Sequence, residues 1–174
     1  DTIGDGLGGT AVQRDSGYSI RFLAFLAIGY DWIYDYSGFT DALKSEFNTR
    51  MNSWIDWYAA NGYARNGPAI NNYFGGYLMA MGLIGHTTYP DNSRAAEHIT
   101  NSRNLLDTLV IPSFSGELKG GDSPEGWSYG TGHFVRILNY IQAIKTATGE
   151  DIFATFTWPK EVILAQIHLT KPGL

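Results

Sequence analysis

The sequence predicts an all-α fold made of antiparallel helix pairs. Apolar residues recur at three- and four-residue steps in several segments, which is the spacing of one face of an α-helix. Residues that favour helix caps precede these segments, and glycine follows several of them. No segment alternates apolar and polar residues convincingly, so we expect no β-sheet.

Three helices are predicted in the first half of the chain, at residues 16–36, 40–62 and about 72–85. Asp15 or Ser16 caps the first helix, whose middle is so apolar that we expect it to be buried on all sides. The second helix begins at a capping threonine and ends at a glycine. Its apolar face consists of Leu43, Phe47, Met51, Trp54 and Tyr58.

The third predicted helix contains four glycines, which weaken a helix intrinsically. We therefore expect them to allow a close helix contact or the approach of a ligand. These residues are Gly75, Gly76, Gly82 and Gly85.

Three more helices are predicted in the second half. Asn92 or Ser93 caps a fourth helix that runs to about Val110. A fifth helix follows the glycine-rich loop and ends at Gly149, and a sixth begins near Pro159, because proline favours the first turn of a helix.

The predicted domain organisation is a flexible glycine-rich arm at residues 1–13 followed by one α-helical domain at residues 14–174. Alternating helices of this kind form a bundle or a segment of an α/α toroid. The first and sixth helices are apolar nearly all round, so an isolated unit would expose apolar surface. We therefore expect a fragment of a larger protein with neighbouring domains, or a homo-oligomer.

Composition excludes several classes of partner. The net charge is -5 and the 12 Lys and Arg residues are scattered, so neither nucleic acid nor a membrane surface is an expected partner. The longest apolar run, at residues 22–30, is too short to span a bilayer. The chain has no cysteine, no His/Asp/Glu grouping with metal-ligand spacing and no phosphate-binding glycine motif. We therefore expect no metal and no cofactor.

The most informative segment is the loop at residues 120–134, which contains more polar and aromatic side chains than a plain helix connection needs. It holds two carboxylates, a tyrosine, a tryptophan and an imidazole among five glycines and a proline, directly before an apolar helix. Loops at such positions often carry binding and catalytic residues. The candidates here are Asp122, Glu125, Trp127, Tyr129 and His133.

Three segments together resemble the α/α-toroid domain of heparinase II/III-like polysaccharide lyases. They are residues 30–35 (YDWIYD), residues 71–72 (NN) and residues 122–129 (DSPEGWSY), and the resemblance covers roughly residues 17–152. It implies an α/α toroid, a secreted or periplasmic protein, and an acidic polysaccharide or oligosaccharide as the ligand.

The resemblance also implies β-elimination at a uronic acid. Asn71 or Asn72 would donate hydrogen bonds to the substrate carboxylate, which stabilises the enediolate that forms. Tyr129 would remove or return a proton, as a tyrosine can when positive charge lowers its pKa from about 10. Many members of that family have a histidine after the asparagine, where this chain has Asn72, so His133, His86 or a residue outside this chain would replace it. Trp127, Glu125, Asp122 and Tyr73 are the expected substrate-binding residues.

Two other classes of function stay open. In an α/α-toroid hydrolase, Glu125 would protonate the glycosidic oxygen and Asp122 or Asp31 would activate water. In a non-catalytic carbohydrate-binding or scaffold domain, the trough would be kept without the chemistry.

Each candidate also has a structural interpretation. Asn71 would cap its helix, Glu125 would hold the loop, Tyr129 would pack at the helix start, and His133 would be a core histidine. His98 and His168 are expected on the helix surface.

Overall fold

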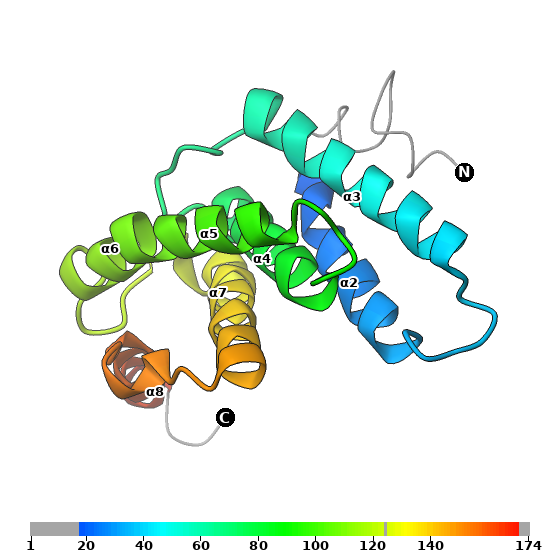
Figure 1. Ribbon diagram of the computed structural model, residues 1–174. Coiled ribbons are helices and arrows are strands. Elements are labelled where there is room, and N and C mark those ends of the chain that lie inside the picture. Colours follow the sequence, from blue (N-terminus) through cyan, green and yellow to red (C-terminus); the bar gives the residue numbers. More distant parts are fainter. Residues whose placement is uncertain (1–17, 124, 171–174) are drawn as a thin grey trace.

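The computed structural model describes residues 18–123 and 125–170. Most of these residues are helical and no strand lies among them, so the predicted all-α class is confirmed (Figure 1). The predicted arm at residues 1–13 and the predicted cap at Asp15 or Ser16 lie outside the described residues.

The six predicted helices are present. After a short 3-10 turn η1 (Tyr18–Phe22), the first three are α2 (Leu23–Trp32), α3 (Asp41–Asn61) and α4 (Asn72–Thr87). The fourth is α5 (Ala95–Leu105), which continues through a π-helical turn η2 (Leu106–Val110) into α6 (Ile111–Gly116). The last two are α7 (Gly126–Thr148) and, after the 3-10 turn η3 (Ile152–Ala154), α8 (Trp158–Leu169).

Local chemistry sets several of these boundaries. The Thr40 hydroxyl accepts the backbone N–H of Leu43 at the start of α3, and Gly149, at φ 79°, ends α7 in the left-handed conformation that glycine adopts most readily. The fourth helix was expected to stop near residue 110 but runs on to Gly116. Pro112 does not stop it because it sits in the first turn of α6, where its missing N–H is tolerated.

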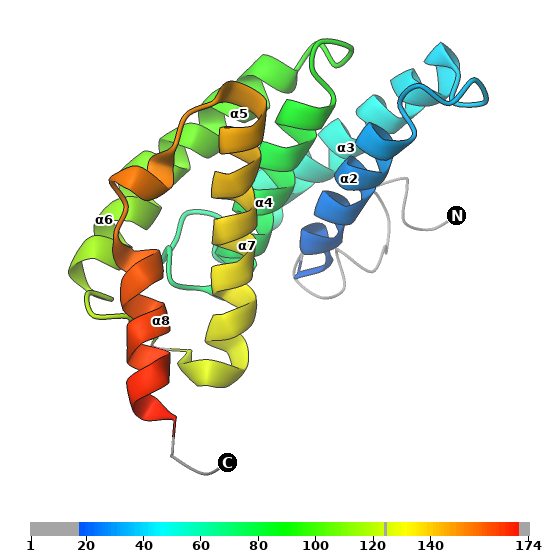
Figure 2. The same cartoon turned by 90° about the horizontal axis from the view of Figure 1, so that it is seen from below.

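The helices form hairpins in which α2, α4 and α7 all run in the same direction. Arg21, just before α2, lies against Gly76 near the start of α4, and Figure 2 shows α2 running in the same sense as α4. His133 and Tyr140 of α7 lie against Gly75 and Gly82, so α7 also advances along α4 in this sense. The partner helices α3, α5 and α8 run the opposite way (Figure 2). A segment of an α/α toroid would have this alternation, and the toroid itself stays a prediction.

The central helix α4 is almost entirely buried, and its glycines explain how neighbours approach it so closely. A Cβ on Gly75 would lie 2.2 Å from the Nδ1 atom of His133, and one on Gly82 would lie 2.0 Å from the ring of Tyr140. Gly76 likewise packs against Arg21. The prediction that these glycines allow close helix contacts is therefore confirmed.

A cluster of aromatic rings around Trp158 packs α8 against the rest of the core. The rings of Phe114 and Phe134 each lie 4.6 Å from that of Trp158, measured between centroids. The indole N–H of Trp158 donates to the Leu118 carbonyl at 2.7 Å. This bond satisfies the polar group of a fully buried ring.

Two apolar faces stay exposed. The prediction that the first helix is buried on all sides is wrong for this chain, because Phe25 is 65% exposed while Leu23 and Ala27 face the core. On α8, Ile163 and Ile167 are about 60% exposed. Among the described residues, each of these two helices has neighbours on one side only. Among the helices described, none is both long and apolar enough to cross a membrane.

His98 was expected on the surface and is instead buried on α5. Its Nε2 lies 2.8 Å from the Oδ1 atom of Asn52 on α3, and Asn52 in turn exchanges hydrogen bonds with Asn92. The prediction failed because the polar partner comes from a distant helix. His168 is exposed, as predicted.

Candidate functional site

Helices α4 and α7 run parallel and begin at the same end of the molecule. This brings together two of the segments singled out in the sequence, residues 71–72 and residues 122–129. The backbone N–H of Asn72 and its side-chain Nδ2 both donate to the Glu125 Oε1 atom, at 3.3 Å and 3.1 Å. A carboxylate is favoured at this position because the first N–H groups of a helix have no partner within the helix. Glu125 thus ties the loop before α7 to the first turn of α4.

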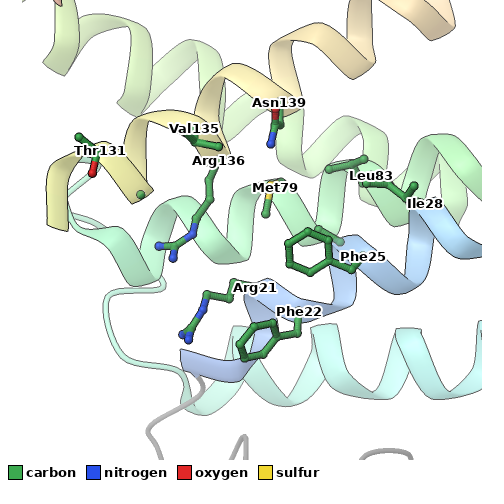
Figure 3. Close-up of a pocket in the computed structure, with 12 residues that line it drawn as sticks. Arg21, Phe22, Phe25, Ile28, Met79, Leu83, Thr131, Val135, Arg136 and Asn139 are labelled. Atoms are coloured by element: carbon green, nitrogen blue, oxygen red, sulfur yellow. The ribbon is translucent and has the colours of Figure 1, made fainter. Parts of the chain in front are cut away.

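Arg136 extends this cluster. Its Nη1 donates to the backbone carbonyl of Asn72 at 2.9 Å. In Figure 3 its side chain points back along α7 toward the residues that begin this helix. The sequence prediction did not include Arg136. Its spacing from Tyr129, seven residues or two helical turns, is the signal that places both on one side of α7.

His133 lies beneath the cluster, only 1% exposed, with its ring against Gly75. Burial lowers its pKa to about 4; the Ala69 backbone opposes this shift, and the charge of Arg136 adds to it. The ring is therefore neutral at neutral pH. The interpretation of His133 as a core histidine fits this burial.

Buried polar atoms without hydrogen-bond partners concentrate here. Of six such side-chain atoms in the described part of the chain, four belong to three residues of this cluster. They are the Oδ1 atom of Asn72, the Oε2 atom of Glu125 and both ring nitrogens of His133. Native proteins leave few buried polar groups unpaired, and those that exist call for an explanation such as a functional site.

Asn71 and Tyr73 flank Asn72. The Asn71 side chain accepts the Tyr73 N–H at 2.9 Å, so the capping role predicted for Asn71 is confirmed. The bond engages the side-chain oxygen of Asn71 and not its amide nitrogen. The Tyr73 ring packs edge-on against Tyr63, with centroids 5.3 Å apart.

The remaining loop candidates differ in accessibility. Tyr129 is 64% exposed and stands one turn before His133 on α7. Asp122 is exposed, and its Oδ1 accepts the N–H of Ser123 at 2.7 Å. The side chain of Trp127 lies outside the described structure.

The predicted hydrolase pair of Glu125 and Asp31 is wrong. Asp31 lines the same hollow as Gln142 and Thr146 of α7, and Gln142 is 17 residues after Glu125 along the same chain segment. This separation corresponds to about 25 Å along a helix. Paired carboxylates in glycosidases lie within about 10 Å of each other. Helix direction, which the sequence did not reveal, separates them.

A hollow of about 460 Å³ opens beside the cluster, with α4 as its floor and α2 and α7 as its walls (Figure 3). Met79 and Leu83 form the floor. The side chains of Arg21 and Arg136 enter from opposite walls and point toward the same end. Arg21 also stacks on the ring of Phe22, with its Cζ atom 4.3 Å from the centroid.

A second hollow of about 470 Å³ continues the first along α7. The two share Ile28, Leu83 and Asn139, so together they form one groove, which we call the α4 groove. Asp31 and Trp32 line its far part, and Trp32 is 82% exposed.

Within the described residues, no group of three or more His, Cys, Asp or Glu side chains is arranged to hold a metal ion. No protein-family model, curated protein or solved structure matches this chain.

Proposed function

We propose that this chain is a polysaccharide-lyase-like domain that binds uronate-containing polysaccharide at the common end of α4 and α7 and cleaves it by β-elimination. The observation that supports the proposal most is the cluster of Asn72, Glu125 and Arg136, which brings a cation to the start of α4, while the exposed Tyr129 lies on α7 two helical turns before Arg136. A uronate needs a group that neutralises its carboxylate and a group that moves a proton, and this end of the molecule offers both.

The carboxylate would be neutralised by Arg136 and by the amide nitrogen of Asn71. Asn72 is less suited to this task because its own amide nitrogen already donates to Glu125. In our proposal Asn72 and Glu125 position the first turn of α4. Arginine suits the neutralising role because its planar guanidinium matches the geometry of a carboxylate.

Tyr129 would carry the proton transfers, since its phenol is exposed and His133 is too deeply buried to reach a substrate. The phenolate removes the C5 proton of the uronate. The electron pair forms the C4–C5 double bond, the bond from C4 to O4 breaks, and the leaving oxygen takes a proton from the phenol. The products are an unsaturated uronate and a new chain end.

The test is a panel of acidic polysaccharides with absorbance of the unsaturated uronate as the readout. We expect turnover on at least one polymer. Tyr129→Phe should abolish turnover and leave binding largely intact, because it deletes only the hydroxyl. Tyr36→Phe, at an exposed tyrosine outside the cluster, is the matched control. Full activity in Tyr129→Phe contradicts the assignment of Tyr129.

A binding-only domain is the second candidate, favoured by one observation. The histidine that many relatives have after the asparagine is Asn72 here, and the substitute, His133, is inaccessible. Binding of an acidic polysaccharide without any product would support this candidate. New reducing ends without the unsaturated product would instead support a hydrolase that uses Glu125 with Asp122.

A further inference from the structure

A small polar hollow lies on the side of α4 that faces away from the α4 groove. Met79 and Leu83 form the floor of the groove, whereas Tyr77 and Met81 line the hollow. Residues two apart on a helix point in directions about 200° apart, so the two sites lie on opposite sides of α4. The hollow has a volume of about 230 Å³, and its other walls come from α3, α5 and the segment between α3 and α4.

The polar groups that line this hollow have few partners of their own. Arg65 donates to the backbone carbonyl of Gly62 at 3.0 Å and forms no ion pair with any described carboxylate. The side-chain amides of three asparagines make no hydrogen bond within the described part of the chain, and these residues are Asn66, Asn101 and Asn104. None of the described residues that line the hollow is acidic.

Tyr77 adds a buried hydroxyl to the hollow. It is 6% exposed, its ring packs on that of Tyr58 with centroids 4.6 Å apart, and its hydroxyl has no hydrogen-bond partner among the described residues. Burial raises its pKa and the charge of Asp56 adds to this shift, so the phenol is protonated at neutral pH. Asp56 is itself paired with Arg94 at 2.6 Å. A buried polar group without a partner calls for an explanation such as a ligand.

We propose that this hollow binds an acidic residue of an extended peptide from a partner protein, with the carboxylate at Arg65 and Tyr77 and the flanking peptide groups at Asn101 and Asn104. The inference goes beyond the proposed function, because it concerns a second ligand on the opposite side of α4.

The cationic and donor groups of the lining favour a carboxylate. The guanidinium of Arg65 has N–H groups that are not used within the described structure, and its planar shape matches the two oxygens of a carboxylate. The phenol of Tyr77 can donate a further hydrogen bond. Ala64, directly before Arg65, has φ 58°, a backbone conformation that residues other than glycine rarely adopt. Strained backbone of this kind is often found at binding sites.

The two asparagines of α5 favour a peptide as the source of this carboxylate. Asn101 and Asn104 are three residues apart, so they lie on one side of the helix with Cβ atoms about 5–6 Å apart. A side-chain amide offers a donor and an acceptor, and a peptide group presents one N–H and one C=O that can pair with both. The described lining has no exposed aromatic face on which a sugar ring could stack, because the ring of Tyr77 is buried.

The experiment measures binding of blocked pentapeptides to the full chain by calorimetry. One peptide has a central glutamate between alanines, and the matched peptide has glutamine in its place. We expect the glutamate peptide to bind about tenfold more tightly, because hydrogen bonds to a charged group are the stronger ones. Free glutarate, which has carboxylates and no peptide group, should bind about tenfold more weakly than the glutamate peptide.

Two variants test the carboxylate end of the hollow. Arg65→Gln should lower the affinity for the glutamate peptide to that for the glutamine peptide. Arg50→Gln makes the same charge change on α3 outside the hollow and should change neither affinity. Tyr77→Phe should weaken binding of the glutamate peptide by about fivefold. It removes a hydroxyl without a partner among the described residues, so the fold should not be affected.

A double variant tests the peptide-binding wall. Asn101→Ala with Asn104→Ala should weaken binding of both peptides by about fivefold and leave glutarate binding unchanged. Asn61→Ala, at an exposed asparagine outside the hollow, is the control and should weaken neither. Asn101 and Asn104 are exposed on α5, so the double variant should fold even if Arg65→Gln does not.

Each contrary result overturns the inference. Equal affinity for the glutamate and glutamine peptides, or equal effects of Arg65→Gln and Arg50→Gln, excludes the carboxylate contact. Unchanged peptide binding in the double asparagine variant excludes the peptide contact, and equally tight binding of glutarate identifies a site for a small free carboxylate instead. Absence of binding to both peptides excludes the site altogether. None of these results affects the proposed function, because its measurement is the unsaturated uronate.

Discussion

The side-chain amide of Asn72 donates to the Glu125 carboxylate at 3.1 Å across 53 residues of sequence. Asn72 is 6% exposed, and the same carboxylate oxygen accepts its backbone N–H. One contact thus joins the first turn of α4 to the loop that leads into α7. The two residues belong to separate motifs in the sequence, and the shared direction of the two helices brings them together.

Removal of the Glu125 carboxylate should destabilise the fold. Glu125→Ala leaves the buried amide of Asn72 without its acceptor, so we expect a loss of about 1–3 kcal/mol in the free energy of unfolding. Urea denaturation of Glu125→Ala, Asn72→Ala and the double variant measures the coupling. Asp35→Ala, at the opposite end of the molecule, is the control and should be additive with Asn72→Ala. Additivity of the Glu125 and Asn72 variants contradicts the contact.

Two glycine-to-alanine variants should have opposite effects. Gly29 lies in α2 with open space where an alanine methyl group would lie, so Gly29→Ala should stabilise by about 0.5–1 kcal/mol through helix propensity. Gly82→Ala would push against the Tyr140 ring, whose hydroxyl donates to Ser102 at 2.7 Å. We expect a loss of about 2 kcal/mol from overpacking. Thermal unfolding measures both, and a stable Gly82→Ala protein would disprove the close packing.

His133 should make the fold sensitive to acid. Its pKa is about 4 in the folded chain and 6.5 when exposed, so the unfolded chain binds the proton first as the pH falls. The contribution of the neutral ring is fully present above pH 6.5 and is lost between pH 6.5 and 4, by about 3 kcal/mol. Denaturation across this range should show a shallower loss in His133→Gln than in the native chain. His168→Gln, at an exposed histidine, should keep the native slope.

The exposed apolar face of α8 should drive association. Ile163 and Ile167, both about 60% exposed, lie on the same side of the helix because they are four residues apart. We expect the chain to form oligomers at rising concentration in sedimentation experiments, because association removes apolar surface from water. The double variant Ile163→Ser/Ile167→Ser should be monomeric. The control Lys160→Ser should associate like the native chain. A native chain that is monomeric at every concentration contradicts the prediction.

Local patterns predicted most of the fold and part of the candidate site. The spacing of apolar residues on α3, the Thr40 and Asn71 caps and Gly149 depend on neighbours within a few residues, so each could be recognised in the sequence. The glycines of α4 could also be recognised in the sequence. Several glycines in one predicted helix indicate close packing, although they do not identify the neighbouring helix. Asn72, Glu125 and His133 were identified as candidates because their motifs are also local.

Only the tertiary structure decided how these local pieces meet. The direction of α4 relative to α7 places Asn72 beside Glu125, brings Arg136 to the same point and separates Asp31 from both. It also buries His98 against Asn52 and His133 beneath Gly75. The physical reason is that helix propensity and capping act over one or two turns, whereas burial, desolvation and charge pairing depend on residues that the packing of distant helices brings together.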